Sequence, residues 1–247
     1  MKYFLLRGGS FLYGIVLYFL FVRRLKLHEL VKGKRVAIIG PANSSVDEKK
    51  GTYIDEFDIV IRINKAPSVI ASGKFDAFIG TKVDMLFHSF FENTQSGGGP
   101  LDIALFESLG IRYLVNPVAE FRGYRVIFNF FKKYKYRKNV YVLPAQAYRR
   151  WKKKLNGYQP TIGFCALMSL LECDFEELFL SGFTFFKTGF AEGYRDNMRE
   201  STQVQEFIRN HGLHNPEMEF EIFRDAVYRA KGKKILTDRT LNALLYQ

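Results

Sequence analysis

The stretch RVAIIGPANSS (residues 35–45) decides the fold of this chain of 247 residues. It places a short, continuous apolar run before a glycine and a polar turn, as at the end of a buried parallel strand. Neither the G-x-G-x-x-G spacing of dinucleotide sites nor the G-x-x-x-x-G-K-[ST] spacing of P-loops is present in it, so neither standard nucleotide site is supported. The pattern alone is weak evidence for any nucleotide, since any α/β domain has glycines where strands end.

Similar apolar runs recur along the chain, at residues 57–63, 83–87, 112–118, 140–144 and 177–183. Helical patterns lie between several of them, at 101–109, 122–137, 145–154 and 162–173. This alternation predicts an α/β fold: a single Rossmann-like, mostly parallel twisted sheet flanked by helices. After the last run, residues 184–197 resemble a loop, and 198–211 and 216–231 look helical. Because ligands bind beyond the carboxyl ends of such strands, we expect the functional residues there.

The composition is strongly basic. The chain has 37 Lys and Arg against 25 Asp and Glu, a formal net charge of +12 and a pI of about 9.6. This favours an anionic partner, whether nucleotide, acidic sugar, anionic lipid or nucleic acid, and does not choose among them. Three basic clusters, KKYKYRK (132–138), RRWKKK (149–154) and RAKGKK (229–234), favour a charged surface or a membrane face over merely solvated charge.

Residues 1–30 are predicted to form an apolar and basic segment that associates with a membrane, and residues 31–247 a single catalytic domain. The apolar run from Phe11 to Val22 is short for a bilayer span, which needs about 20 residues. Arg23, Arg24 and Lys26 follow it, so a span would leave the domain on the cytoplasmic face, where we expect it. A helix lying in the interface and a buried N-terminal helix are the alternatives.

Neither a disulfide nor a metal centre is expected. Cys165 and Cys173 are eight residues apart in one predicted helix, too far apart to be bridged, which favours a reducing compartment. No Asp-x-Asp follows a strand, and no His and Cys cluster has the spacing of metal ligands.

Three ordered motifs resemble those of the animal-type sialyltransferases. The segments IIGPANSS, IDEFDIVIRINKAPS and DAFIGTKVDMLF, between residues 38 and 87, resemble the long sialylmotif, with close matches at RINKAP and GTK. PTIGFCALMSLLECDFEELFLSGF (160–183) resembles the short sialylmotif. His214 and Glu219 fit the family's spacing of a histidine, four residues and a glutamate. Together the matches run from about residue 35 to residue 221.

The resemblance implies an inverting, metal-independent glycosyltransferase without a cofactor. It would move sialic acid, or a related 2-keto sugar acid such as Kdo, from a CMP-sugar to a hydroxyl of a glycan or glycolipid. The apolar N-terminus and the basic clusters favour a lipid-linked acceptor at an anionic membrane surface. Nucleic acid is not an expected partner of such an enzyme. The alternative is a catalytically lapsed sialyltransferase-like protein, or a basic protein that binds nucleic acid or membranes.

His214 is the predicted catalytic base. Asn215 as N-cap and Pro216 at the first helical position place a helix N-terminus beside the imidazole, which disfavours its protonation. A surface histidine before a helix is the plain alternative, and His88 is the alternative base. Glu219 is interpreted as a positioning residue or a helix-face charge. The substrate-binding residues implied by the resemblance are Gly40, Asn43, Ser44, Asn64, Thr161, Ile162, Gly163, Gly182, Phe183 and Tyr194.

Two departures from the family pattern matter. Ala37 stands where the family has the first cysteine of its usual disulfide, so that bond cannot form here. The family's third motif has a histidine that meets the donor phosphate, whereas AEGYRDN (191–197) keeps only Tyr194. We therefore expect the phosphate contact from Tyr194, from Arg195 or from the helix start at residues 161–163.

Overall fold

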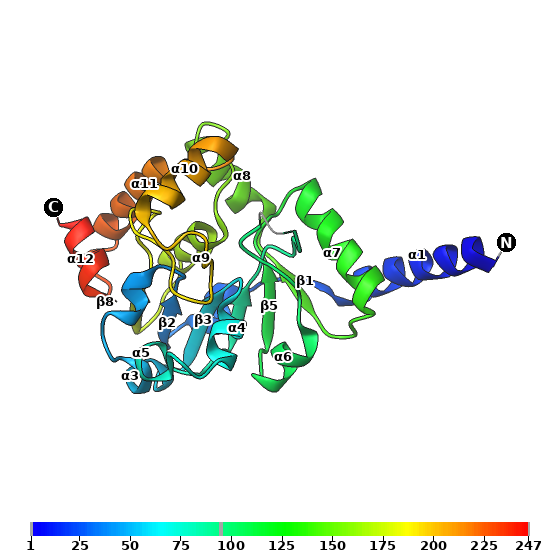
Figure 1. Cartoon of the computed structure of the whole chain (residues 1–247), viewed down its shortest axis with the longest axis horizontal. Coiled ribbons are helices and arrows are strands. Elements are labelled where there is room, and N and C mark those ends of the chain that lie inside the picture. Colours follow the sequence, from blue (N-terminus) through cyan, green and yellow to red (C-terminus); the bar gives the residue numbers. More distant parts are fainter. Residues whose placement is uncertain (1, 94–95, 247) are drawn as a thin grey trace.

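The computed structural model describes residues 2–93 and 96–246. Within them the chain forms one eight-stranded sheet in which all strands are parallel, in the order β1-β6-β5-β4-β3-β2-β7-β8 (Figure 1). The strands are β1 Val22–Arg24, β2 Arg35–Ile39, β3 Ile59–Ile63, β4 Met85–Phe87, β5 Tyr113–Asn116, β6 Val140–Val142, β7 Glu177–Ser181 and β8 Ile235–Thr237. The predicted fold class is confirmed.

All six predicted strands are present, and two short strands were missed. β1 and β8 have three residues each and lie at the two edges of the sheet, so neither carries enough residues for a recognisable pattern. The strand predicted at 177–183 ends earlier, at Ser181, because Gly182 has a left-handed φ of 75° and turns the chain away.

The helices alternate with the strands and cover both faces of the sheet (Figure 1). They are α1 Lys2–Phe21, α2 Leu27–Val31, η1 Asn43–Val46, α3 Gly51–Asp55, α4 Ala66–Ala71, α5 Asp76–Ile79, α6 Ile103–Ser108, α7 Phe121–Tyr134, α8 Ala145–Lys154, α9 Ile162–Leu171, α10 Ser201–His211, α11 Pro216–Arg229 and α12 Arg239–Leu245. Each predicted helix is present, shifted by up to three residues at its ends. Cys173 lies beyond the end of α9, so the two cysteines do not share that helix; both are free and buried.

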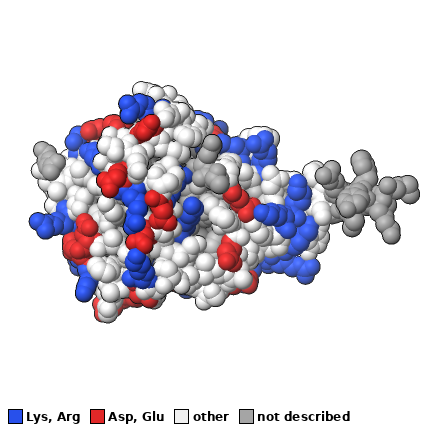
Figure 2. All heavy atoms as spheres, in the orientation of Figure 1, with Lys and Arg blue, Asp and Glu red and all other residues white. Residues whose placement is uncertain are grey.

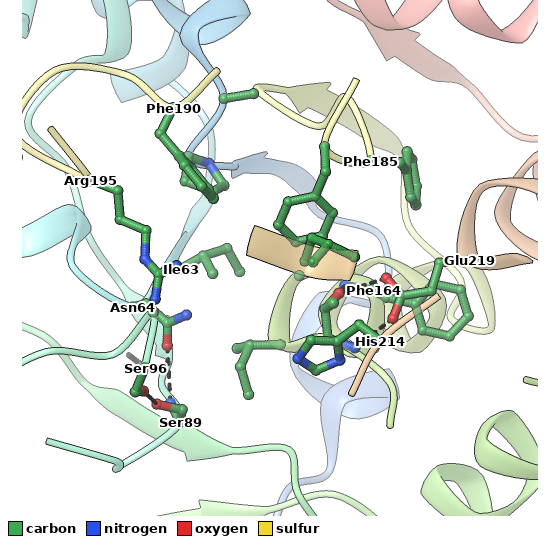
Figure 3. Close-up of a pocket in the computed structure, with 18 of the residues that line it drawn as sticks. Ile63, Asn64, Ser89, Ser96, Phe164, Phe185, Phe190, Arg195, His214 and Glu219 are labelled. Atoms are coloured by element: carbon green, nitrogen blue, oxygen red, sulfur yellow. Dashed lines mark hydrogen bonds between the residues drawn. The ribbon is translucent and has the colours of Figure 1, made fainter. Parts of the chain in front are cut away.

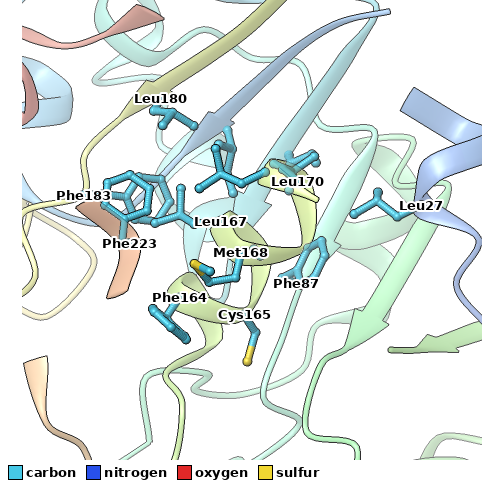
Figure 4. Close-up of a cluster of buried hydrophobic side chains, with 14 of the residues drawn as sticks. Leu27, Phe87, Phe164, Cys165, Leu167, Met168, Leu170, Leu180, Phe183 and Phe223 are labelled. Atoms are coloured by element: carbon cyan, nitrogen blue, oxygen red, sulfur yellow. The ribbon is translucent and has the colours of Figure 1, made fainter. Parts of the chain in front are cut away.

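Alternate residues of β2 are buried on the two faces of the sheet. Val36 and Ile38 belong to one buried cluster, whereas Ala37 and Ile39 belong to the cluster on the other face. The first cluster is built around α9, whose apolar residues are almost all buried against the strands (Figure 4). A helix that is apolar all round is stable only when it is enclosed in this way.

Several residues of the long motif hold the fold together. Arg62 on β3 is fully buried and donates to the carbonyls of Ile79, at 2.6 Å, and of Lys82, at 3.1 Å. The Asp55 carboxylate accepts from the N–H groups of Thr81 and Lys82. A Cβ at Gly80 would lie 2.3 Å from Asp55 Oδ1, so only glycine allows this approach. These contacts hold β3 and the end of α3 against the turn of residues 79–82, which precedes β4.

The N-terminal segment 1–30 provides α1, β1 and α2. β1 pairs with β6 at the edge of the sheet, and α1 extends from the body beside α7 (Figure 1). Over the described residues, we find no helix with both the length and the hydropathy needed to cross a bilayer.

Candidate active site

A pocket of about 360 Å³ lies beyond the carboxyl ends of the central strands. Its wall includes residues one or two positions beyond the ends of β2, β3, β4 and β7. It also includes eight of the eleven predicted site residues, namely Asn64, Thr161, Ile162, Gly163, Gly182, Phe183, Tyr194 and His214. The volume is that of a site for a small molecule. Residues from five separate parts of the sequence thus converge on one cavity.

The other three predicted residues lie behind the wall. A Cβ at Gly40 would lie 2.3 Å from the carbonyl oxygen of Gly182, so this glycine lets two strand ends approach. Ser44 is buried, and its hydroxyl donates to Asp238 at 3.3 Å. The N–H of Asn43 donates to the carbonyl of Gly189 at 3.0 Å and ties the first turn to the loop after β7. In this structure Gly40, Asn43 and Ser44 support the pocket without lining it.

His214 is held in the pocket by two hydrogen bonds between the segments that precede α9 and α11. Its Nδ1 lies 2.6 Å from the carbonyl oxygen of Gln159, and the N–H of Gln159 donates to the carbonyl of Leu213 at 2.9 Å. A carbonyl oxygen only accepts, so in the neutral ring Nδ1 carries the proton and Nε2 keeps its lone pair. The half-buried imidazole therefore has the tautomer that a base needs.

The surroundings of His214 favour the neutral ring. Burial lowers its pKa, the Gln159 carbonyl opposes this, and the positive charges of Arg122 and Arg195 lower the pKa further. As predicted, α11 starts beside it, with the Asn215 side chain accepting from the N–H of Met218 and Pro216 in the first turn. The helix dipole acts in the same direction as the two arginines.

Glu219 is a buried positioning residue, and its interpretation as a charge on the helix face is wrong. It is 1% exposed, and its two carboxyl oxygens contact the N–H and the hydroxyl of Thr161, each at 2.7 Å. The Thr161 hydroxyl in turn accepts from the N–H of Phe164 and caps α9. Glu219 thereby fixes the start of α9, which lines the pocket, in relation to α11, which carries His214.

Burial raises the pKa of Glu219 to about 8, although the two contacts with Thr161 lower it. The carboxyl group is therefore mostly neutral at pH 7. The acidic and basic side chains of the described pocket wall are Arg122, Arg195, Glu219, His211 and His214. With Glu219 neutral, the positive charge of the wall comes from Arg195 and from Arg122, whose Nε donates to the Glu120 carboxylate at 2.5 Å.

Arg195 and Asn64 lie on one side of the pocket, and His214 and Glu219 on the other (Figure 3). Asn64 follows β3 with a left-handed φ of 47°, and its Oδ1 accepts from the N–H of Ser89 at 3.0 Å. The guanidinium of Arg195 lies 4.8 Å from the ring centroid of Phe207 and 5.8 Å from that of Phe190. Its charge is thus held between two aromatic side chains at the pocket wall.

Tyr194, an expected phosphate contact, lies in the pocket wall but is almost fully buried. It is 4% exposed, its ring stacks on Phe190, and its hydroxyl donates to the carbonyl of Ile63 at 3.3 Å. The structure therefore gives the hydroxyl of Tyr194 a backbone partner, which leaves Arg195 and the start of α9 as the expected phosphate contacts.

Sequence reasoning missed the aromatic part of the pocket. The wall also contains Phe185, Phe186 and Phe190, from a loop that pairs with the first turn through a bridge between Ala42 and Phe190. Phe185 and Phe186 both have left-handed backbones, with φ of 50° and 61°. Such conformations cost of the order of 1 kcal/mol each and are found at functional sites. The aromatic residues of the stretch 183–186, just after β7, could have indicated this part of the pocket wall from the sequence.

His88 does not serve as a base in this structure. It is 1% exposed, Nδ1 accepts from the N–H of Phe90 at 2.9 Å, and Nε2 lies 3.1 Å from the carbonyl oxygen of Gly98. Burial lowers the pKa of His88 to about 4. Both ring nitrogens are used to hold the loop after β4, so the histidine is structural. Among the described residues, no group of three His, Cys, Asp or Glu side chains is placed to hold a metal ion.

Comparison with solved structures identifies a fold with known relatives. The crystal structure of a mammalian sialyltransferase aligns with a TM-score of 0.56 and 19% identity, over 92% of this chain and 78% of that one. A mammalian sialyltransferase in complex with Gal-β1-3GalNAc-ortho-nitrophenol aligns with a TM-score of 0.55 and 18% identity, over 92% and 79%. No family profile and no curated sequence matches. The chain therefore has a sialyltransferase-like fold.

Proposed function

We propose that this protein is an inverting glycosyltransferase that moves sialic acid, or a related 2-keto sugar acid, from a CMP-sugar to a hydroxyl of a membrane glycolipid. The observation that carries the proposal is the position of His214. A half-buried imidazole with a free Nε2 lies in a pocket at the strand ends, beside a helix N-terminus. The likeness to sialyltransferase structures supports the same reaction class.

The chemistry needs a base and a site for negative charge. Loss of CMP from a 2-keto sugar acid leads to an oxocarbenium-like state, and the phosphate leaves already ionised, so it needs no proton. The acceptor hydroxyl must lose a proton as it attacks from the opposite face. In our proposal Nε2 of His214 takes that proton, while Nδ1 stays bonded to the Gln159 carbonyl and orients the ring.

The pocket provides charge for the donor. A CMP-sugar acid carries a phosphodiester and a carboxylate. The lining offers Arg195 with a neutral Glu219, and Arg122, which is paired with Glu120, lies in the same wall. The first N–H groups of a helix have no intrahelical partner, so those of Ile162 and Gly163 can donate to an anion. We assign the phosphate to Arg195 and to this helix start, in place of the histidine of the family's third motif.

The first test is nucleotide specificity. CMP should raise the melting temperature of the full chain, whereas AMP and GMP should not. Stabilisation by RNA that is lost with salt, without any response to CMP, would refute the proposal and favour a nucleic-acid-binding protein.

The second test separates an enzyme from a lapsed one. Donor hydrolysis and transfer should be measured with CMP-sialic acid and CMP-Kdo on glycolipid extracts. His214→Ala should lower kcat by about 10²–10⁴-fold, the usual contribution of a general base, and should leave CMP binding unchanged. His211→Ala is the matched control. His211 is exposed at the pocket rim and its Nδ1 contacts the Phe207 carbonyl, so its loss should change kcat only slightly. Equal turnover of both variants would exclude His214 as the base.

A further inference from the structure

One half of α1 is apolar and exposed. Phe11, Leu12, Val16, Phe19 and Leu20 are each at least 50% exposed, and Phe19 reaches 76%. At about 100° per residue these five side chains occupy one side of the helix. Single exposed apolar residues are ordinary, but a contiguous apolar face marks a surface that is covered by something else.

The opposite half of α1 is packed on α7. Leu17 is buried there, and at the border between the two halves the ring of the partly exposed Phe11 meets that of Phe128 edge to face at 5.3 Å. A Cβ at Gly14 would lie 3.1 Å from the Cβ of Lys132, so a glycine brings the two helices into close contact. The exposed face is therefore presented by a helix that is fixed to the body.

Basic side chains surround the place where α1 joins the body, as Figure 2 shows. We name five of them the basic collar: Arg23, Arg24, Lys132, Lys135 and Arg137. Within residues 2–93 and 96–246, none of the five forms an ion pair with a carboxylate. The positive charge of the collar is thus not neutralised by the described part of the chain.

Tyr13 ties the basic collar to α1. Its hydroxyl accepts from Nε and Nη2 of Arg137 at 2.9 and 2.6 Å, and Nζ of Lys135 lies 5.2 Å from its ring centroid. Nζ of Lys135 is buried, and no described residue accepts a hydrogen bond from it. Lys135 therefore adds a positive charge that no described carboxylate neutralises, held beside the ring of Tyr13.

We propose that the apolar face of α1 and the basic collar dock this protein on an anionic lipid bilayer, with α1 lying in the interface. The uncharged part of α1 after Arg7, residues 8–21, rises only about 21 Å, against a hydrocarbon core of about 30 Å. Partial insertion of an apolar face flanked by Lys and Arg is the arrangement of interfacial helices. A second copy of the chain would bring its own collar to the contact, and like charges would oppose the pairing.

Flotation of the full chain with vesicles tests this inference independently of the CMP-sugar chemistry. Wild-type protein should float with vesicles of phosphatidylcholine and phosphatidylserine at 7:3, and much less with phosphatidylcholine alone. Arg23→Gln with Arg24→Gln should weaken the partition about 25-fold, since each basic residue near such a surface contributes about fivefold. Arg229→Gln with Lys231→Gln, two exposed residues near the other end of the molecule, should have little effect.

The apolar face needs its own variant. Leu12→Ser with Phe19→Ser should abolish flotation, whereas Tyr246→Ser, at an equally exposed aromatic near the C-terminus, should not. Both variants should keep the cooperative urea unfolding of the wild type, which separates loss of docking from loss of the fold. Equal flotation of wild type with neutral and anionic vesicles would overturn the inference. So would normal flotation of the Leu12 and Phe19 variant, or a wild-type dimer in the absence of lipid that this variant dissociates.

Discussion

The neutral state of Glu219 leads to the sharpest prediction, because it can be measured without knowing the substrate. The carboxyl group has a pKa of about 8 in the folded protein, against 4.5 for a free glutamate. Between these two pH values the folded state binds a proton that the unfolded state has lost. Stability must therefore fall as the pH rises through this window.

The magnitude follows from the two pKa values. Each pH unit between them is equivalent to about 1.4 kcal/mol, so Glu219 should reduce the free energy of unfolding by about 4 kcal/mol between pH 5 and pH 8.5. A domain has only about 5–15 kcal/mol in total, so the effect should dominate the alkaline side of the stability profile.

Glu219→Gln should remove this slope. A glutamine cannot ionise. Its amide oxygen can still accept from the N–H of Thr161, and its NH2 group can donate to the Thr161 hydroxyl oxygen, which in the wild type donates to the carboxyl group. The variant should match the wild type at pH 5 and be more stable at pH 8.5, with a urea midpoint about 1–2 M higher. Its turnover at pH 7 should stay within a few-fold of the wild type, because the same contacts position α9.

The matched control is Glu217→Gln, on the same helix but exposed. It should leave the pH profile of the wild type unchanged. If Glu219→Gln also follows the wild-type profile from pH 5 to pH 8.5, the buried carboxyl group is ionised throughout. The positive charge of the pocket wall would then be offset by this carboxylate.

Two further predictions concern residues behind the pocket. Burial lowers the pKa of His88 to about 4, against 6.5 when free, so the free energy of unfolding of the wild type should fall by up to about 3 kcal/mol as the pH falls from 6.5 to 4. His88→Gln should flatten this acid slope in urea unfolding. Gly40→Ala should lower the free energy of unfolding by about 1–3 kcal/mol, because its Cβ would lie 2.3 Å from the carbonyl oxygen of Gly182, whereas Gly232→Ala, with open space around it, should be close to neutral. Equal urea midpoints for the two alanine variants would contradict this packing.

The central sheet could be predicted because its strands are long and apolar. β2, β3 and β7 each have five residues, buried on both faces, and such runs stand out in a sequence. β1 contains Val22, Arg23 and Arg24, which resemble the basic end of an apolar helix. Its pairing with β6 joins residues more than a hundred positions apart, and no local pattern carries that information.

The candidate site was predictable only where local sequence sets the geometry. Asn215 and Pro216 are typical of a helix start, and His214 is placed by this start because it directly precedes it. Glu219 follows in an amphipathic helix that has other exposed carboxylates, and its burial depends on Thr161, 58 residues away. The part of the wall formed by Phe185 and Phe186 depends on left-handed backbones that non-glycine residues rarely adopt, so the sequence pointed to a plain loop.

The residues that resemble the sialylmotifs are of two kinds: some stabilise the fold and others line the pocket. Only those that line the pocket bear on activity. Arg62 and Gly80 are explained by buried contacts, so a protein that had lost its activity would still keep them. The residues that favour an active enzyme are His214, whose Nε2 has no partner among the described residues, and Arg195, which lines the same pocket. Both groups also make structural contacts, His214 with the Gln159 carbonyl and Arg195 with Phe207 and Met198. A variant of either residue that keeps the stability of the wild type and loses turnover will therefore discriminate between an active enzyme and an inactive protein.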